Sequence, residues 1–497
     1  MMSSAAANMP VLVVIAPLFT AFVLTTLARR IRLVEGLVVF TGILVLIGSG
    51  FLAADVFNKE TAIIYQVGGW PAPWGIELKA GSVGVFFLLV ASFVSVPVSL
   101  FSVNNLSDEV GGKERTARFY VLYLLLCGAM YGMAVTNDLF NVFVLVEVAT
   151  LSCCGLVSSR NRPRAAEAAF TYLILATLGS TLILGGIGFI YIITGHLNMG
   201  FVHDELNRIW QSEPHVVWTS FSFMLVGFGV KSALFPLHVW LPDAHSTAPS
   251  PASAILSGIA VKGYLICLLK ILYNVFGYTL MRAFAINTIL VLAGSIAIIA
   301  GAVLALMQTE LKRRLAFSTV SQIGYIIMGI GIMNTKGLSG TLFYLAGHAV
   351  AKAVLFLAAG AMISASGRKK ISELAGIGRK MPVTMAAFTV GSLGLTGIPL
   401  FSGFVGKWYL ILGSLESGSF FPAVVIIAGS ILCAAYLFSV VRVAYFEPAP
   451  DENWKDPGLA QKIALIVLAS AVLVLGILPD PFLELAGRAA EELLALK

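Results

Sequence analysis

The sequence predicts an all-α integral membrane protein with about fourteen transmembrane helices, and three observations lead to this fold class. Hydrophobic residues make up 58% of the 497 residues and charged residues only 11%, with a mean hydropathy of +0.93. Apolar runs recur along the chain, each long enough to cross about 30 Å of hydrocarbon. The segments between these runs alternate between rich and poor in lysine and arginine. Soluble domains do not combine these features.

The apolar runs form two sets of seven, so both termini are expected on one side of the membrane. The runs lie near residues 9–28, 33–57, 82–103, 117–136, 139–158, 168–195, 217–241, 250–277, 284–306, 315–333, 338–364, 381–414, 422–446 and 460–483. Loops on one side contain 20 of the 32 lysines and arginines, loops on the other side contain seven, and five lie within runs. Because basic loops resist translocation, the basic side is predicted to be cytoplasmic and both termini to lie outside the inner (plasma) membrane.

Several functional classes are excluded by composition. The net charge of +7 follows from the topology, so we infer no nucleic-acid binding. The five cysteines lie within apolar runs without metal-type spacing, which is typical of packing residues. We find no haem-type histidine pair, metal-ligand cluster or phosphate-binding loop, and therefore expect no cofactor and no metal.

Several ionisable residues lie deep within the apolar runs, where a charge costs about 2.5 to 3.5 kcal/mol. They are Glu147, Lys231, Lys262, Lys270, His348, Lys352 and Lys407. Burial disfavours a charged lysine and a nearby carboxylate favours it, so such a lysine can bind or release a proton after a small change in nearby charge. A row of them therefore favours a path for protons.

Some of these residues also have simpler interpretations. Lys270 lies in the last third of its run, where its ammonium group can equally reach the lipid headgroups. His348 and Lys352 are four residues apart on one helix face, which alone fits a structural pair as well as a relay. Glu147 needs a nearby cation in its apolar surroundings. Asp138 is predicted to cap a helix from a short loop.

Prolines predict interruptions in two lysine-bearing runs. Pro236 should break its helix one turn beyond Lys231. Pro399 should free the carbonyl of Leu395, and glycines loosen the chain before Lys407. Broken helices at matching positions of two repeats indicate ion sites near the middle of the membrane.

The spacing of the runs predicts an internal repeat. Pro236 and Pro399 are 163 residues apart, and neighbouring runs recur at similar offsets. We therefore expect an N-terminal three-helix segment, two inverted five-helix repeats, and a C-terminal helix with a short tail. Their boundaries are 1–116, 117–283, 284–446 and 447–497.

Several motifs between Phe119 and Arg442 together resemble a known family. They span residues 143–147, 230–245, 248–262, 312–324, 348–352 and 403–407. They are similar to the antiporter-like proton-translocating subunits of respiratory complex I, of Mrp-type Na+/H+ antiporters, and of membrane-bound hydrogenases and formate hydrogenlyases. The resemblance implies fourteen core helices in two inverted repeats. It also implies a role for each buried charge. Glu147 and Lys231 would form the input pair, and Lys262 would be the central relay. His348 and Lys352 would extend the relay, and Lys407 would end it.

The resemblance further implies a subunit that moves H+, alone or coupled to Na+, beside other membrane subunits in the lipid bilayer. Any redox chemistry would belong to those partners. The stretch 242–250, and Lys407 where one complex I subunit type has Glu, favour an Mrp D-type or hydrogenase-type complex. The end at Lys497 argues against the longer family type with a lateral helix. A complex I subunit of the M or N type is the alternative, and a stand-alone solute transporter is a more distant one.

Overall fold

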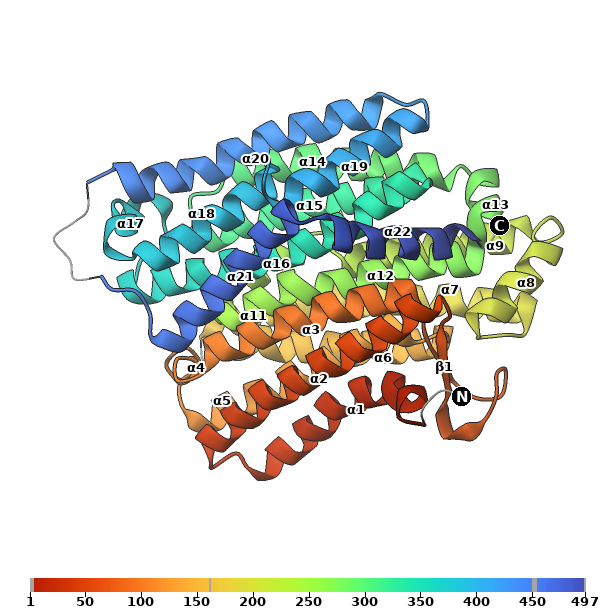
Figure 1. The fold of residues 1–497 in the computed structure, drawn as a ribbon, viewed down its shortest axis with the longest axis horizontal. Helices are drawn as coiled ribbons and strands as arrows, with labels where there is room; N and C mark the ends of the chain where they lie inside the picture. Colours follow the sequence, from red (N-terminus) through yellow and green to blue (C-terminus); the bar gives the residue numbers. More distant parts are fainter. Residues whose placement is uncertain (1–3, 161, 449–453, 496–497) are drawn as a thin grey trace.

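The computed structural model describes residues 4–160, 162–448 and 454–495. Its long helices run side by side in one bundle (Figure 1). Within the described residues, twelve helices are long and apolar enough to span a membrane. Eleven of them are α1 (Ser4–Thr26), α2 (Ile31–Lys59), α3 (Ser82–Ser102), α5 (Lys113–Val135), α6 (Leu139–Ser158), α7 (Pro163–Thr194), α14 (Ile286–Leu306), α15 (Leu311–Ile332), α16 (Thr335–Ser366), α20 (Phe421–Phe446) and α21 (Leu459–Ile477).

The twelfth span, Ser250–Ala283, is a continuous helix that changes its hydrogen-bond pattern twice. It consists of α11 (Ser250–Ile255), the π-helical turn η2 (Leu256–Ala260), α12 (Val261–Ile271), a second π-helical turn η3 (Leu272–Phe276) and α13 (Gly277–Ala283). Its most apolar stretch is completely buried, as is that of α15. These two spans form the centre of the bundle.

The two remaining runs are interrupted, as the prolines predict. One contains α9 (Pro214–Lys231), which is followed after a break by α10 (Trp240–Thr247), and the other contains α18 (Pro382–Thr396) and α19 (Ser402–Glu416). Every one of the fourteen predicted runs therefore corresponds to a long helix or to an interrupted one. The all-α membrane fold class is confirmed.

The first interruption lies closer to Lys231 than predicted. Helix α9 ends at Lys231 itself, and Ala233 has a positive φ of 57°. The Leu234 N–H then donates to the Gly229 carbonyl at 2.8 Å, which is the closing bond of a Schellman motif. The motif ends the helix before the chain reaches Pro236, whose missing N–H was expected to cause the break. The prediction that the helix continues for one turn beyond Lys231 was therefore wrong.

The second interruption follows the predicted pattern. Helix α18 ends at Thr396, and Gly397 takes the left-handed conformation with φ of 87°. The start of α19 then lies so close to α18 that a Cβ on Gly403 would be 1.9 Å from the Gly394 carbonyl oxygen. A glycine is required at this approach.

Shorter elements complete the chain. They are β1 (Ile63–Gln66), η1 (Val67–Gly69), β2 (Glu77–Ala80), α4 (Leu106–Val110), α8 (Met199–Ile209), η4 (Ile371–Leu374), α17 (Ile377–Lys380) and α22 (Asp480–Ala495). The two strands form an antiparallel hairpin. Helix α22 packs along α3 and α16 (Figure 1), and Arg488 anchors it by donating to the Phe57 carbonyl at 2.6 Å. The described part of the expected short tail is thus helical.

Candidate ion-translocation site

The charged residues predicted within the membrane lie in the interior, on helices that contact one another in sequence. Lys231, Lys262, Lys352, Lys407 and His348 are each 4% exposed or less. Helix α9 packs against α12, the π-turn η2 before α12 packs against α16, and α16 packs against α19. The lysines therefore follow one another across the bundle, from α9 to α19.

Glu147 on α6 has the neighbouring cation that its surroundings require. The Lys231 Nζ lies 3.8 Å from the Glu147 Oε1 and donates to the Thr150 Oγ1 at 2.5 Å. Lys231 is also the last residue of α9, where the helix dipole favours a cation. The Glu147 Oε1 is buried without a hydrogen-bond partner among the described residues, while 32% of the Glu147 side chain is exposed. The predicted pair is thus held at ion-pair distance near the outer face of the bundle.

The ammonium group of Lys262 is held by the π-turn that precedes it. In a regular α-helix the Val261 N–H would donate to the Ser257 carbonyl, but here it donates to Leu256. The Ser257 carbonyl is therefore free to accept from the Lys262 Nζ. The Ser257 hydroxyl also pairs with the Thr319 hydroxyl of α15 at 3.0 Å. The turn contains Gly258 but no proline, and we did not predict this change of register from the sequence.

Helix α16 presents Tyr344, His348, Lys352 and Phe356 at successive turns of one face. Lys352 donates to the Leu315 carbonyl at 2.8 Å and to the Ser318 hydroxyl, and its Nζ lies 5.7 Å from the centre of the Phe356 ring. His348 stacks on the Tyr344 ring. Both ring nitrogens of His348 are buried without a partner among the described residues. The shared face predicted for His348 and Lys352 is confirmed.

Lys407 lies on α19 and closes the end of α18. Its Nζ donates to the carbonyls of Leu395 and Thr396 at 2.9 and 3.1 Å, and to the Ser430 hydroxyl at 3.1 Å. The carbonyl that Pro399 was expected to free is therefore bound by the lysine itself. The ammonium also lies 4.6 Å from the centre of the Tyr325 ring, within the range of a cation–π contact.

A polar cluster that we did not predict lies beside His348 and Lys407. The Tyr344 hydroxyl donates to the Gln322 Oε1, and the Gln322 Nε2 donates to the Tyr436 hydroxyl at 3.1 Å. All three side chains are buried. Their hydroxyl and amide groups provide hydrogen-bonding positions near His348 and Lys407.

Two residues of uncertain role have structural partners. Lys270 is 5% exposed and donates to the carbonyls of Ala134 and Thr136 at 3.1 and 2.5 Å, so its ammonium is held by protein rather than extended to the headgroups. Asp138 accepts from the Asn141 N–H at 2.8 Å and caps α6, as predicted. Burial raises the pKa of the Asp138 carboxyl, and backbone N–H groups only partly oppose this.

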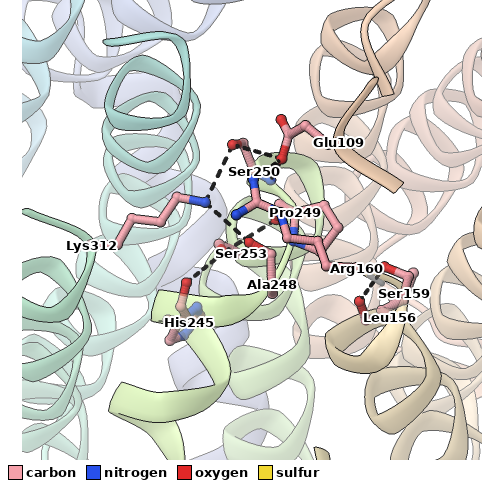
Figure 2. Close-up of polar contacts among 10 residues, drawn as sticks. All are labelled: Glu109, Leu156, Ser159, Arg160, His245, Ala248, Pro249, Ser250, Ser253 and Lys312. Atoms are coloured by element: carbon pink, nitrogen blue, oxygen red, sulfur yellow. Dashed lines mark hydrogen bonds and ion pairs between the residues drawn. The ribbon is translucent and has the colours of Figure 1, made fainter. Parts of the chain in front are cut away.

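A second charged cluster, which no sequence pattern predicted, joins four segments that are distant in the sequence (Figure 2). Glu109 Oε2 lies 2.5 Å from the Arg160 Nη2 and accepts from the Ser250 N–H at 2.9 Å. Lys312 donates to the Ala248 carbonyl and the Ser250 hydroxyl. Burial alone would raise the pKa of the Glu109 carboxyl, but Lys312, Arg160 and the Ser250 N–H hold that pKa below its ordinary value. The cluster fixes the start of α11.

His245 lies on α10 close to this cluster (Figure 2). Its backbone carbonyl accepts from the Ser253 hydroxyl at 3.0 Å, and its ring stacks on Phe356 with centres 4.6 Å apart. Both ring nitrogens are buried without a partner among the described residues. Because Lys352 contacts the same Phe356 ring, His245 lies next to the lysine row.

The described residues contain no group of three or more His, Cys, Asp or Glu side chains that could hold a metal ion. The five cysteines are unpaired and lie within helices, four of them buried.

A membrane-embedded bundle with two interrupted helices and a row of buried lysines defines a class of ion-translocating membrane subunits. The sequence pattern of the family described as NADH:quinone oxidoreductase/Mrp antiporter, transmembrane region, matches residues 136–433, which is more than half of the chain. The chain belongs to this family, and the predicted resemblance is confirmed. It is an antiporter-like membrane subunit.

Relatives come from three kinds of complex. The chain is 33% identical to NADH-quinone oxidoreductase subunit N of Desulforudis audaxviator, over 96% of this chain and 97% of the relative. Among solved structures, it is similar to a chain of an archaeal membrane-bound sulfane sulfur reductase, with 29% identity, a TM-score of 0.90, and coverage of 98% and 97% of the two chains. It is also similar to a chain of the Mrp complex from Dietzia sp., with 26% identity, a TM-score of 0.90, and coverage of 99% and 98% of the two chains.

Proposed function

We propose that this chain moves protons across the membrane, alone or coupled to Na+, as one subunit of a multisubunit ion-pumping complex. The observation that carries the proposal is the row of buried protonatable side chains on helices that contact one another. In order along the chain, the residues of the proposed path are Glu147, Lys231, Lys262, His348, Lys352 and Lys407.

The partners of the buried ammonium groups suit proton exchange. Lys262, Lys352 and Lys407 are hydrogen-bonded to carbonyls and hydroxyls, and no carboxylate lies within 4.0 Å of them in the described part of the chain. Only Lys231 has an acidic partner. If one of these three lysines loses its proton and becomes a neutral amine, no neighbouring carboxylate loses its counter-ion. A proton that arrives at one lysine also disfavours the charge on the next, which promotes transfer along the row.

Further support comes from the two interrupted helices. Each interruption lies beside a lysine of the row: Lys231 is the last residue of α9 and its ammonium reaches Thr150 and Glu147 on α6, whereas the Lys407 ammonium binds the carbonyls at the end of α18. We propose that these are corresponding positions of two inverted five-helix repeats, residues 117–283 and 284–446, between an N-terminal segment and a C-terminal helix.

We also propose that the chain lies in the inner (plasma) membrane with both termini outside. The two described chain ends lie at the same end of the bundle, the N-terminal one near β1 and the C-terminal one near α13, whereas α4 and α17 lie at the other end (Figure 1). The basic segments 29–32, 113–118, 162–164 and 368–380 lie at or between the helix ends on the side of the bundle where α4 and α17 lie. This arrangement supports a cytoplasmic position for the basic end.

For the complex, we propose an Mrp-type antiporter or a membrane-bound hydrogenase-type assembly, with other membrane subunits as partners. The likeness to chains of the Mrp complex and the sulfane sulfur reductase, each with a TM-score of 0.90, supports this context. The 33% identity to an NADH-quinone oxidoreductase subunit N favours the alternative, a complex I-type assembly. Affinity purification of the tagged chain from its own membranes distinguishes them. Mrp-type or hydrogenase-type subunits should co-purify, and NADH-dehydrogenase subunits would favour the alternative.

The proposed path is tested at its centre by Lys262→Ala. The variant complex, purified and reconstituted into liposomes, should lose nearly all proton uptake, because Lys262 lies on the buried span Ser250–Ala283, which packs against both α9 with Lys231 and α16 with Lys352. Lys336→Ala is the matched control, since Lys336 is an exposed lysine paired with Glu416 at a helix end. Normal uptake by an assembled Lys262→Ala complex would exclude this path.

A further inference from the structure

A basic groove lies at one end of three membrane helices, away from the lysine row. It has a volume of about 620 Å3 and is formed by the start of α5, the end of α6 and the start of α7. Four of its eleven lining residues are arginines and none is acidic. The arginines are Arg115, Arg118, Arg160 and Arg162.

Two of these arginines lack a counter-ion within the chain. Arg160 is bound to Glu109 in the cluster of Figure 2, and Arg118 is paired with Glu114 at 2.5 Å. Arg115 and Arg162 are exposed, and neither has an acidic partner in the described part of the chain. The groove therefore has an excess of positive charge, which an anion can neutralise.

The rest of the groove is apolar and leads along the helices. Phe119, Leu122 and Gly155 line it on the side of the membrane interior. Beyond it, Leu151 on α6 and Phe170 on α7 are exposed, each about one turn from a groove residue. Since all three helices span the membrane, the arginines lie at the depth of the lipid headgroups and the exposed apolar residues lie at the depth of the acyl chains.

We propose that this groove binds an anionic phospholipid, with the phosphate-containing headgroup on Arg115 and Arg162 and an acyl chain along α6 and α7. Basic pockets between helix ends are suited to anionic headgroups, and guanidinium groups bind phosphate oxygens in pairs. The start of α7 adds its helix dipole to the same end of the groove. A free phosphate ion would use the arginines but not the apolar track, so the combination favours a lipid.

The test compares phospholipid binding by two charge-matched variants. R115Q/R162Q removes the two unpaired arginines, whereas R379Q/K380Q removes two exposed basic residues elsewhere on the basic end. Each whole complex is delipidated in detergent and mixed with phosphatidylglycerol or with phosphatidylcholine of the same acyl chains. Native mass spectrometry then measures the lipid retained on this subunit after its release from the complex.

The parent and R379Q/K380Q should retain phosphatidylglycerol in preference to phosphatidylcholine. R115Q/R162Q should bind phosphatidylglycerol about thirtyfold more weakly, or roughly fivefold for each arginine. S158W, which fills the groove without changing its charge, should also lose the lipid. The proposal is overturned if both lipids bind equally, if R115Q/R162Q keeps phosphatidylglycerol, or if inorganic phosphate displaces it completely. Cross-linking of S158C to another subunit would overturn it as well, because a protein would then fill the groove.

Discussion

Replacing Glu147 by Gln is the most informative perturbation of the proposed path. The side chain keeps its shape and hydrogen-bonding capacity but loses the charge that lies 3.8 Å from the Lys231 Nζ. At that distance two unit charges interact by about 4 kcal/mol with an effective dielectric constant of 20. Because 32% of the Glu147 side chain is exposed, screening reduces this to roughly 2 kcal/mol. Protonation of Lys231 should become about thirtyfold less favourable.

Proton transport should fall by about the same factor if Lys231 receives the proton from Glu147. The measurement is proton uptake into vesicles, normalised to the amount of assembled complex. Asp at position 147 should retain more activity than Gln, because it keeps the charge with one methylene less of reach. Glu416→Gln provides the control, since it removes an equivalent charge from an exposed ion pair with Lys336. Its transport should equal that of the parent.

The double variant tests whether the two residues act as one unit. Glu147→Gln combined with Lys231→Ala should transport about as well as the worse of the two single variants, because residues that share one step are not additive. Two outcomes would refute the reasoning. One is parental transport by Glu147→Gln, and the other is a double variant whose loss equals the product of the two single losses. Either would make Glu147 a packing or assembly residue.

Three further predictions concern other parts of the chain. Lys407→Ala should abolish transport while the complex still assembles on a native gel, because water can bind the freed carbonyl of Leu395; normal pumping would make Lys407 structural. Cysteines introduced beside Arg160 and Arg368 should resist an impermeant reagent added outside intact cells, and ready labelling of either would reverse the topology. Glu109→Gln should destabilise the complex by roughly 3 kcal/mol, because Arg160 loses a buried counter-ion. The pKa of Glu109 lies below its ordinary value of 4.5, so this stabilisation is present above about pH 4.5 and is lost only as the pH falls through the lower folded pKa. The difference in thermal unfolding temperature between parent and variant should therefore be constant from pH 8 to pH 5. A difference that disappears within this range would contradict the ion pair.

The membrane spans and the buried lysines could be predicted because both depend on local composition. An apolar run long enough to cross a bilayer identifies itself, and a lysine within it is conspicuous. The loss of the helical hydrogen bond to the Leu395 carbonyl was also predictable, because Pro399 has no N–H to donate to it. The binding of that carbonyl to Lys407 was not, since that contact depends on how α19 returns against α18.

Other features depend on interactions that leave no local pattern. The π-turn before Lys262 shifts one hydrogen bond without any proline or unusual glycine conformation. The end of α9 depends on Ala233 in a left-handed conformation, which alanine rarely adopts. The cluster of Glu109, Arg160 and Lys312 joins segments that are far apart in the chain, so only the folded structure brings the three charges together.

The interrupted and distorted helices have a common physical consequence for the lysines. Regular helices use their own carbonyls, whereas the end of α18 leaves the Leu395 carbonyl free for Lys407 and the π-turn leaves the Ser257 carbonyl free for Lys262. A carbonyl dipole stabilises an ammonium group but carries no net charge, so it tolerates the neutral amine far better than a buried carboxylate would. Lysines held in this way can change protonation without leaving an unpaired ion in the membrane. Among the lysines of the row, and within the described residues, only Lys231 lies at ion-pair distance from an acid. That acid, Glu147, is partly exposed, and a path that must exchange charge with its surroundings needs a counter-ion at such a position.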